Sequence, residues 1–93
     1  MEWQELEEKV RLVASYLWDC EAQPETINGV RIDAVCKIRD DYWAIIEITQ
    51  ERSLEKLRTD LAKFASVRPY LFSQSVYPKC YFVCESKPPE SLG

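Results

Sequence analysis

The stretch RIDAVCKIRDDYWAIIEIT, residues 31–49, decides the fold of this chain, because it predicts two β-strands joined by a short turn. Apolar side chains alternate with other side chains over residues 30–38, and the same period of two returns over residues 42–49. Such alternation is typical of β-strands. The second strand carries apolar residues on both of its faces, which indicates a central strand that is covered on both sides.

The link between the two strands sets their register. A three-residue loop, residues 39–41, places Ile38 opposite Tyr42. The same count places Asp33 directly opposite Glu47, and it leaves the other face of both strands apolar throughout. A slip of one residue in the loop would move the two acids to opposite faces of the sheet.

Two carboxylates in opposed strand positions need compensation. Opposed side chains have Cβ atoms about 4.5–5.5 Å apart, where like charges are destabilising and at least one pKa is raised. A divalent cation bridged by Asp33 and Glu47 is one interpretation. The other is a salt-bridge cluster, in which Arg31 or a lysine of a neighbouring helix neutralises the two acids. The loop acids Asp40 and Asp41 are interpreted as solvated turn residues.

An amphipathic helix is predicted over residues 3–18, where apolar residues recur at spacings of three and four. The residues predicted to face the core are Trp3, Leu6, Val10, Val13 and Leu17. Further along, Asn28-Gly29 predicts a two-residue hairpin turn that leads into the strand over residues 30–38.

A second amphipathic helix is predicted after Ser53, which is a suitable N-terminal cap, and Pro69 is expected to end it. Its predicted apolar stripe is Leu54, Leu57, Leu61, Phe64 and Ala65, with Lys56, Asp60 and Lys63 on the polar side. A short strand is predicted over residues 79–86, and an extended tail or linker over residues 87–93.

The predicted order of elements is helix, three antiparallel strands, helix and strand. A helix between the third and fourth strands most simply forms a right-handed crossover, which places the last strand parallel to the third. With 93 residues the chain has material for one core. We therefore expect one α/β domain over residues 1–86, with a mixed four-stranded sheet flanked by two helices.

The net charge of the chain argues against a protein that binds nucleic acid through an overall positive electrostatic potential. The formal net charge is −4, whereas neutralising phosphates needs clustered Lys and Arg. A metal-dependent nuclease remains compatible with this charge, because carboxylates that hold cations count as negative when the metal is left out.

The four cysteines, with no histidine and no C-x-x-C pair, make a structural zinc site improbable. The sequence shows no signal-peptide pattern and no apolar run of membrane-spanning length. We therefore expect reduced thiols in a cytoplasmic protein that does not contact a membrane.

At the two strand acids the sequence resembles the PD-(D/E)xK nuclease superfamily, which has the restriction-endonuclease-like fold. Members carry an acid in one strand, a short turn, and an apolar strand that ends in (D/E)-x-K, within an αβββαβ core. Asp33 in VRIDAV matches the first acid and Glu47 in AIIEIT matches the second. The resemblance covers residues 3–85.

This resemblance implies hydrolysis of phosphodiester bonds of DNA or RNA that depends on Mg²⁺ or Mn²⁺. The two acids would hold the metal, and a lysine two residues after the second acid would position the attacking water. The first helix of the family often adds a further acid. Glu7 fits that role best by its spacing, while Glu5 and Glu8 remain alternatives.

The sequence departs from the family at the lysine, because Thr49 occupies that position and offers a hydroxyl without a cation. Arg31, the expected cross-strand neighbour of Thr49, or Lys56 on the second helix can replace it. Equally, the departure fits a catalytically silent domain that acts in protein interaction or assembly. A third reading is an unrelated α/β interaction module that uses the acids in a salt-bridge cluster.

Several positively charged and aromatic residues are candidates for contacts with a nucleic acid. Arg52 and Lys56 follow the second acid and can contact phosphates, or else they form a solvated first helical turn. Trp18, at a helix end, is a candidate for stacking on a base. Because the domain is small for a nuclease, we expect a homodimer or fusion to further domains.

Overall fold

The computed structural model of the chain describes residues 3–50 and 53–84. Its elements are α1 (Trp3–Trp18), β1 (Gln23–Ile27), β2 (Val30–Arg39), β3 (Tyr42–Thr49), α2 (Leu54–Ser73) and β4 (Tyr77–Cys84). The strands form one sheet in the order β1-β2-β3-β4, antiparallel from β1 to β3, with β4 parallel to β3. The predicted α/β class, element order and mixed four-stranded sheet are thus confirmed.

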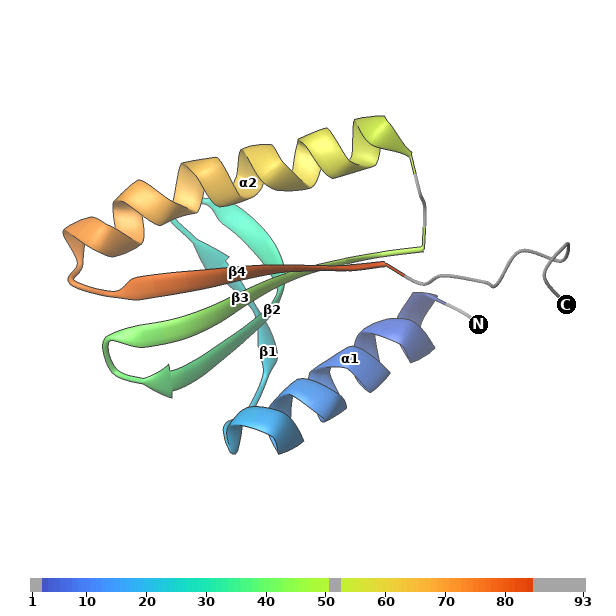
Figure 1. Cartoon of the computed structure of the whole chain (residues 1–93), viewed down its shortest axis with the longest axis horizontal. Helices are drawn as coiled ribbons and strands as arrows, with labels where there is room; N and C mark the ends of the chain where they lie inside the picture. The colour runs from blue at the N-terminus through green and yellow to red at the C-terminus, as the bar shows by residue number, and fades with distance from the viewer. Residues whose placement is uncertain (1–2, 51–52, 85–93) are drawn as a thin grey trace, which may run out of the picture.

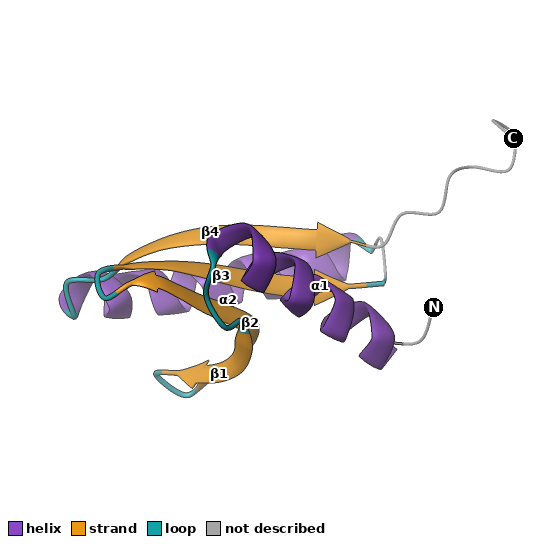
Figure 2. Cartoon of the chain, turned by 90° about the horizontal axis from the view of Figure 1, so that it is seen from below, coloured by secondary structure: helices purple, strands orange, loops and turns teal. Residues whose placement is uncertain are grey.

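The two helices lie on opposite faces of the sheet (Figure 1). Figure 2 shows α1 crossing obliquely in front of the strands while α2 runs behind them. One core cluster lies between the sheet and α1, and a second lies between the sheet and α2. In the described part of the chain, neither helix is long and apolar enough to cross a membrane.

The β1–β2 hairpin has the predicted two-residue turn. Ile27 pairs with Val30, and Asn28 and Gly29 have φ values of 49° and 80°. Both turn residues need the left-handed region, which asparagine and glycine adopt most readily. The sequence signal was therefore specific for this turn.

The β2–β3 hairpin keeps the expected register by a different route. Ala34 pairs with Ile46 and Cys36 with Ala44, as predicted. The predicted pair at the turn is wrong, because a bulge in β2 between Lys37 and Arg39 leaves Arg39 opposite Tyr42. The bulge adds one residue to β2 and the turn has one residue fewer, so the two differences cancel further along the ladder.

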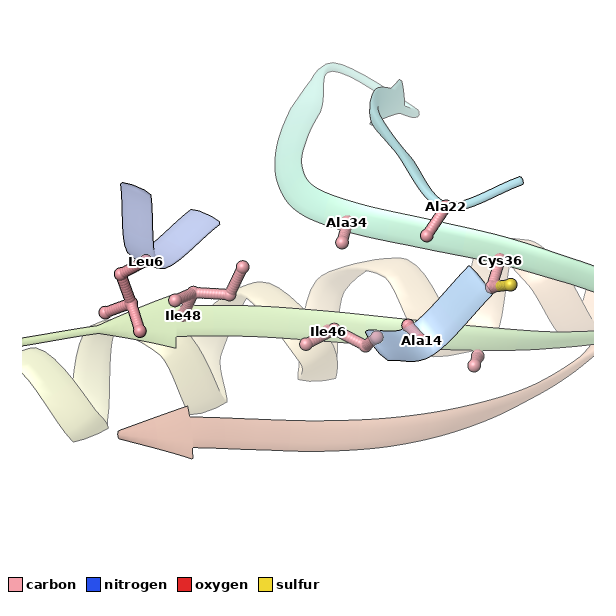
Figure 3. Close-up of a cluster of buried hydrophobic side chains, with 8 residues drawn as sticks. Leu6, Ala14, Ala22, Ala34, Cys36, Ile46 and Ile48 are labelled. Carbon is pink, nitrogen blue, oxygen red and sulfur yellow. The ribbon is translucent and has the colours of Figure 1, made fainter. Parts of the chain in front are cut away.

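Beyond Ala34, β2 curves away from β3 and pairs with β1, where Arg31 lies beside Thr26. The ladder between β2 and β3 therefore ends one residue before Asp33, and the predicted pairing of Arg31 with Thr49 does not form. Figure 3 shows the strong bend of β2 at this point.

The buried face of α1 differs from the predicted stripe. Leu6, Glu7 and Ala14 are buried against the sheet, as Figure 3 shows for the two apolar residues, whereas Val13 and Leu17 are largely exposed. Helix α1 is thus rotated about its axis relative to the prediction, so that Glu7 and Ala14 face the sheet. Alanine at the centre of the contact lets the helix approach the sheet closely, which larger residues would prevent.

The buried face of α2 is rotated in a similar way. Asp60, Phe64, Val67 and Leu71 are buried, so Asp60, which was predicted to lie on the polar side, faces the sheet. The helix also continues through Pro69 to Ser73, which corrects the predicted end. The amide hydrogen that proline lacks would have bonded to the carbonyl of Ala65, which is an exposed residue of α2.

Cys20 and Cys36 form a disulfide, with Cα atoms 6.1 Å apart. The expectation of four reduced thiols is therefore wrong for this pair, while Cys80 and Cys84 are not part of a disulfide. The disulfide joins the loop after α1 to the buried centre of β2. It fastens the C-terminal end of α1 to the sheet.

Ser53 is the N-terminal cap predicted for α2, since its hydroxyl accepts a hydrogen bond of 3.0 Å from the Lys56 amide. We expect Ser53→Ala to lower the free energy of unfolding by about 1 kcal/mol, because one amide of the first turn loses its partner. Urea denaturation measures this change. Ser66→Ala, at an exposed position inside α2, is the matched control and should change stability by less than half as much. Equal effects of the two substitutions would contradict the capping role.

Candidate active site

Glu47 lies in the middle of the sheet and is completely buried. It is held in β3 between β2 and β4, where it pairs with Phe82. Its Oε1 atom is 3.3 Å from Nζ of Lys63, which extends from α2. Within the described residues, neither oxygen of Glu47 accepts a hydrogen bond. A buried carboxylate that accepts no hydrogen bond is costly, so Glu47 is a candidate functional residue.

Asp33 is the second buried acid, and both of its oxygens have partners. Oδ1 is 3.0 Å from Nη1 of Arg31, and Oδ2 accepts a hydrogen bond of 2.9 Å from the Ile48 amide. The second contact occurs where β2 has left β3, so the Asp33 side chain replaces a main-chain acceptor of the sheet. This contact places Asp33 beside the chain segment that carries Glu47.

Helix α2 adds three charged residues to the strand acids. Lys56, Asp60 and Lys63 follow one another at spacings of four and three, which places them on one helix face. Asp60 is fully buried and its Oδ1 atom is 3.1 Å from Nζ of Lys56. The other oxygen of Asp60 has no hydrogen-bond partner in the part of the chain that the structure describes.

The electrostatic environment raises the pKa of Glu47 to about 8. Burial is the largest cause, followed by the nearby Asp33, which accepts a hydrogen bond from protonated Glu47 and repels its ionised form. Lys63 opposes the shift and Asp60 adds to it. At neutral pH the protonated form of Glu47 is therefore favoured.

The pKa of Lys56 is raised by the same acids. Burial would lower it, but the hydrogen bond to Asp60 and the charges of Asp60, Asp33 and Glu47 outweigh burial. Lys56 thus stays protonated, as a cation at the edge of the acidic cluster. Of the two predicted lysine substitutes, Lys56 thus contacts Asp60 and Arg31 contacts Asp33.

The remaining predicted site residues are Thr49, Glu7 and Arg52, with Trp18 as the stacking candidate. Thr49 is buried at the end of β3 and pairs with Cys84 of β4. Glu7 is buried on α1 and forms an ion pair of 3.7 Å with Arg11. Arg52 lies outside the described residues. Trp18 packs on Tyr81, with ring centroids 5.2 Å apart.

Sequence reasoning missed Asp60 and Lys63 as site residues. Their signal is the spacing K-x₃-D-x₂-K, which puts three charges on one face of a helix that directly follows the second strand acid. The apolar stripe containing Leu54 and Leu61 predicted a different buried face for this helix, but both leucines are exposed in the structure. A charged stripe is usually solvated, whereas here Asp60 is buried and Lys56 and Lys63 are partly buried, because the stripe meets the strand acids.

The donor set suits a hard divalent cation. Mg²⁺ is commonly held by one or two carboxylates together with water, and the cluster offers carboxylate oxygens of Glu47 and Asp60 that lack hydrogen bonds. Within residues 3–50 and 53–84, however, no three His, Cys, Asp or Glu side chains converge as a ready metal site. Side chains would have to shift to bind a cation through three carboxylates.

Comparison of the chain with protein families, with curated proteins and with solved structures finds no match.

Proposed function

We propose that this chain is a nuclease domain that hydrolyses phosphodiester bonds of DNA or RNA with Mg²⁺ or Mn²⁺. The observation that supports the proposal is the fully buried Glu47, whose oxygens accept no hydrogen bond from the described residues, beside Asp33 and below the charged face of α2. This arrangement agrees with the resemblance to the PD-(D/E)xK superfamily. The domain would act as a homodimer or as the effector part of a larger protein.

Asp33, Glu47 and Asp60 are the residues that would hold the cation in this proposal. Glu47 and Asp60 have carboxylate oxygens that accept no hydrogen bond from the described residues, and a cation would compete with Lys63 for Oε1 of Glu47. Asp33 fixes the end of β2 beside them. The bound cation would polarise the phosphate and lower the pKa of a water molecule. It would also hold Glu47 in the ionised form, because a nearby positive charge lowers the pKa of a carboxyl group.

Lys63 is proposed to replace the lysine that the family carries at the position of Thr49. Its Nζ atom already contacts Glu47, at 3.3 Å, so it would lie near the negative charge that develops on a phosphate bound to the cation. Lys56, about two turns earlier on the same helix face, would contact the neighbouring phosphate. Arg31 is largely exposed and pairs with Asp33, so its proposed role is to orient that acid.

A catalytically silent interaction module is the second candidate function. Each buried acid already has one cation beside it: Arg31 beside Asp33, Lys56 beside Asp60, and Lys63 beside Glu47. This balance of charge favours a fold that has kept the site as a structural ion-pair network. For either function we propose a cytoplasmic location, in which cellular reductants would open the disulfide that the structure contains.

The test of the proposed function is thermal unfolding with Mg²⁺, with Mn²⁺ and with EDTA, followed by a cleavage assay. We expect saturating cation to raise the Tm by roughly 5 °C, the effect of about 1 kcal/mol in a domain of this size. Asp33→Asn should lose this response, whereas Glu55→Gln, at an exposed position on α2, should keep it. Equal responses of the two variants would contradict a cation site at the strand acids.

The cleavage assay then separates the active from the silent form. Labelled single-stranded DNA, duplex DNA and RNA are incubated with the cation that gave the larger thermal shift. We expect Lys63→Met to lower the cleavage rate about a hundredfold, as loss of a charge-stabilising group does. Arg58→Met, at an exposed position on the same helix, is the matched control. Cation binding without cleavage of any substrate would instead support the silent module.

A further inference from the structure

The two edges of the sheet differ in how they are protected against pairing with another strand. β1 has only five residues, contains Pro24, and shows a register irregularity at its start. In addition, Glu25 of β1 forms an ion pair with Lys37 at 3.1 Å. Short length, proline, bulges and charges are the features by which natural sheets prevent edge pairing.

The opposite edge, β4, has eight residues and lacks this protection over most of its length. Its proline and its charged residue, Pro78 and Lys79, both lie near its start. Residues 80–83 are uncharged, and each is partly exposed although its neighbours in β3 are buried. In the described part of the chain β4 pairs on one side with β3, and no strand pairs with its outer side (Figure 2).

An apolar groove of about 290 Å³ runs beside the same strand. Helix α1 forms one wall with Val13, Leu17 and Trp18, and the sheet forms the floor with Ile46, Tyr81 and Val83. We call this feature the α1–β4 groove, and none of the residues that line it is charged. Val13 and Leu17 remain 57% and 66% exposed, respectively, so apolar surface on the wall is left uncovered.

We infer that the β4 strands of two copies of this chain pair antiparallel about a twofold axis and form a homodimer. The two four-stranded sheets then become one continuous sheet, and the two α1–β4 grooves join across the axis. Tyr81 and Val83 of each copy, which pack toward the α1 side, lie over the border between the subunits.

The surface is complementary to itself in both hydrogen bonding and charge. The open edge requires an extended strand, and the groove beside it requires apolar side chains at every second position. β4 is such a strand, since Tyr81 and Val83 lie on its α1 side. Each chain carries a net charge of −4, but the groove and residues 80–83 contain no acid, so two chains can meet here without repulsion.

Pairing about a twofold axis also explains why one surface can serve both partners. An isologous interface uses the same patch on each subunit, and twofold dimers are the commonest soluble oligomers. If the twofold axis passes within residues 80–83, the two Lys79 side chains lie apart. In such an antiparallel pair, Lys79 of one strand is opposite a residue of the other strand that follows residue 79. This inference does not depend on the proposed nuclease activity.

Sedimentation equilibrium of the full chain over micromolar to submillimolar concentration tests the inference. We expect the wild type to show twice the chain mass, and Leu17→Glu and Val83→Lys each to weaken the dimer by about tenfold or more. Leu12→Glu is the matched control, because Leu12 is 72% exposed on the same helix and does not line the groove. Circular dichroism of each variant separates loss of the dimer from loss of the fold.

Three results would overturn the inference. A wild type that stays monomeric at every concentration would leave the β4 edge to a strand from a different protein. A dimer that neither Leu17→Glu nor Val83→Lys weakens, in folded variants, would place the interface elsewhere. A dimer that Leu12→Glu weakens as strongly as Leu17→Glu would move the contact to the outer face of α1.

Discussion

Glu47→Gln is expected to make the domain more stable than the wild type above pH 8 in EDTA, by a few kcal/mol. The pKa of Glu47 is raised from 4.5 to about 8 in the folded protein, chiefly by burial and by Asp33. Between these two values the folded wild type binds more protons than the unfolded chain, so its stability falls as the pH rises. Each unit of pKa shift corresponds to about 1.4 kcal/mol.

The variant separates this effect from general changes in stability. Glutamine has the shape of protonated Glu47 and does not titrate, so the two proteins should be about equally stable near pH 4.5 and diverge toward pH 8. Lys63 loses its partner in the variant, but its side chain is 29% exposed and remains hydrated. Urea denaturation across this pH range, with fluorescence detection, measures the divergence.

Glu55→Gln serves as the control, because Glu55 is exposed on α2 and this variant keeps Glu47, so its stability should still fall toward pH 8. If Glu47→Gln instead lowers stability by a constant amount, Glu47 is ionised throughout and its ion pair with Lys63 is net stabilising. That result would remove the main electrostatic argument for a functional acid. Saturating Mg²⁺ should reverse the order of stability at high pH if the cation binds Glu47.

Reduction of the disulfide between Cys20 and Cys36 is expected to lower the free energy of unfolding by about 3 kcal/mol. The two cysteines are 16 residues apart, and opening a loop of this length restores that much conformational freedom to the unfolded chain. The Tm should fall by roughly 10–20 °C in a domain of this size. Thermal unfolding with and without a phosphine reductant measures the change.

The variant Cys20→Ala/Cys36→Ala is the control, since its Tm should not respond to the reductant. A count of free thiols in the unfolded, unreduced wild type gives an independent check. Two free thiols, from Cys80 and Cys84, are expected. Four free thiols, together with a Tm that is insensitive to reductant, would show that the disulfide does not form in solution.

The strands and their order could be predicted because their signals are local. Alternation over residues 30–38 and 42–49, and the Asn28-Gly29 turn, each depend on neighbouring residues alone. The bulge in β2 could not be predicted, since an added residue in the strand and a shorter turn give the same register. Two compensating local changes leave no trace in the hydrophobic pattern.

The faces of the helices were the main error, and the candidate site explains it. Periodicity assumes that the buried face of a helix is its most apolar face, yet α2 buries Asp60 and leaves Leu61 exposed. The orientation follows from the acids in the sheet, whose cost of burial falls when Lys56 and Lys63 face them. Asp33 and Glu47 could be predicted as a pair, but their partners on α2 depended on a contact between distant segments.

Asp33 has a structural role besides its place in the proposed site, because its carboxylate accepts a hydrogen bond from the Ile48 amide where β2 leaves β3. Its loss would strand the Ile48 amide inside the protein, whether or not any chemistry takes place nearby. A related domain without the proposed cleavage activity would therefore still need Asp33 for the stability of its fold. Within the described residues Glu47 and Lys63 form no side-chain hydrogen bond to the main chain, so their retention or loss in related sequences would report on the proposed activity more directly.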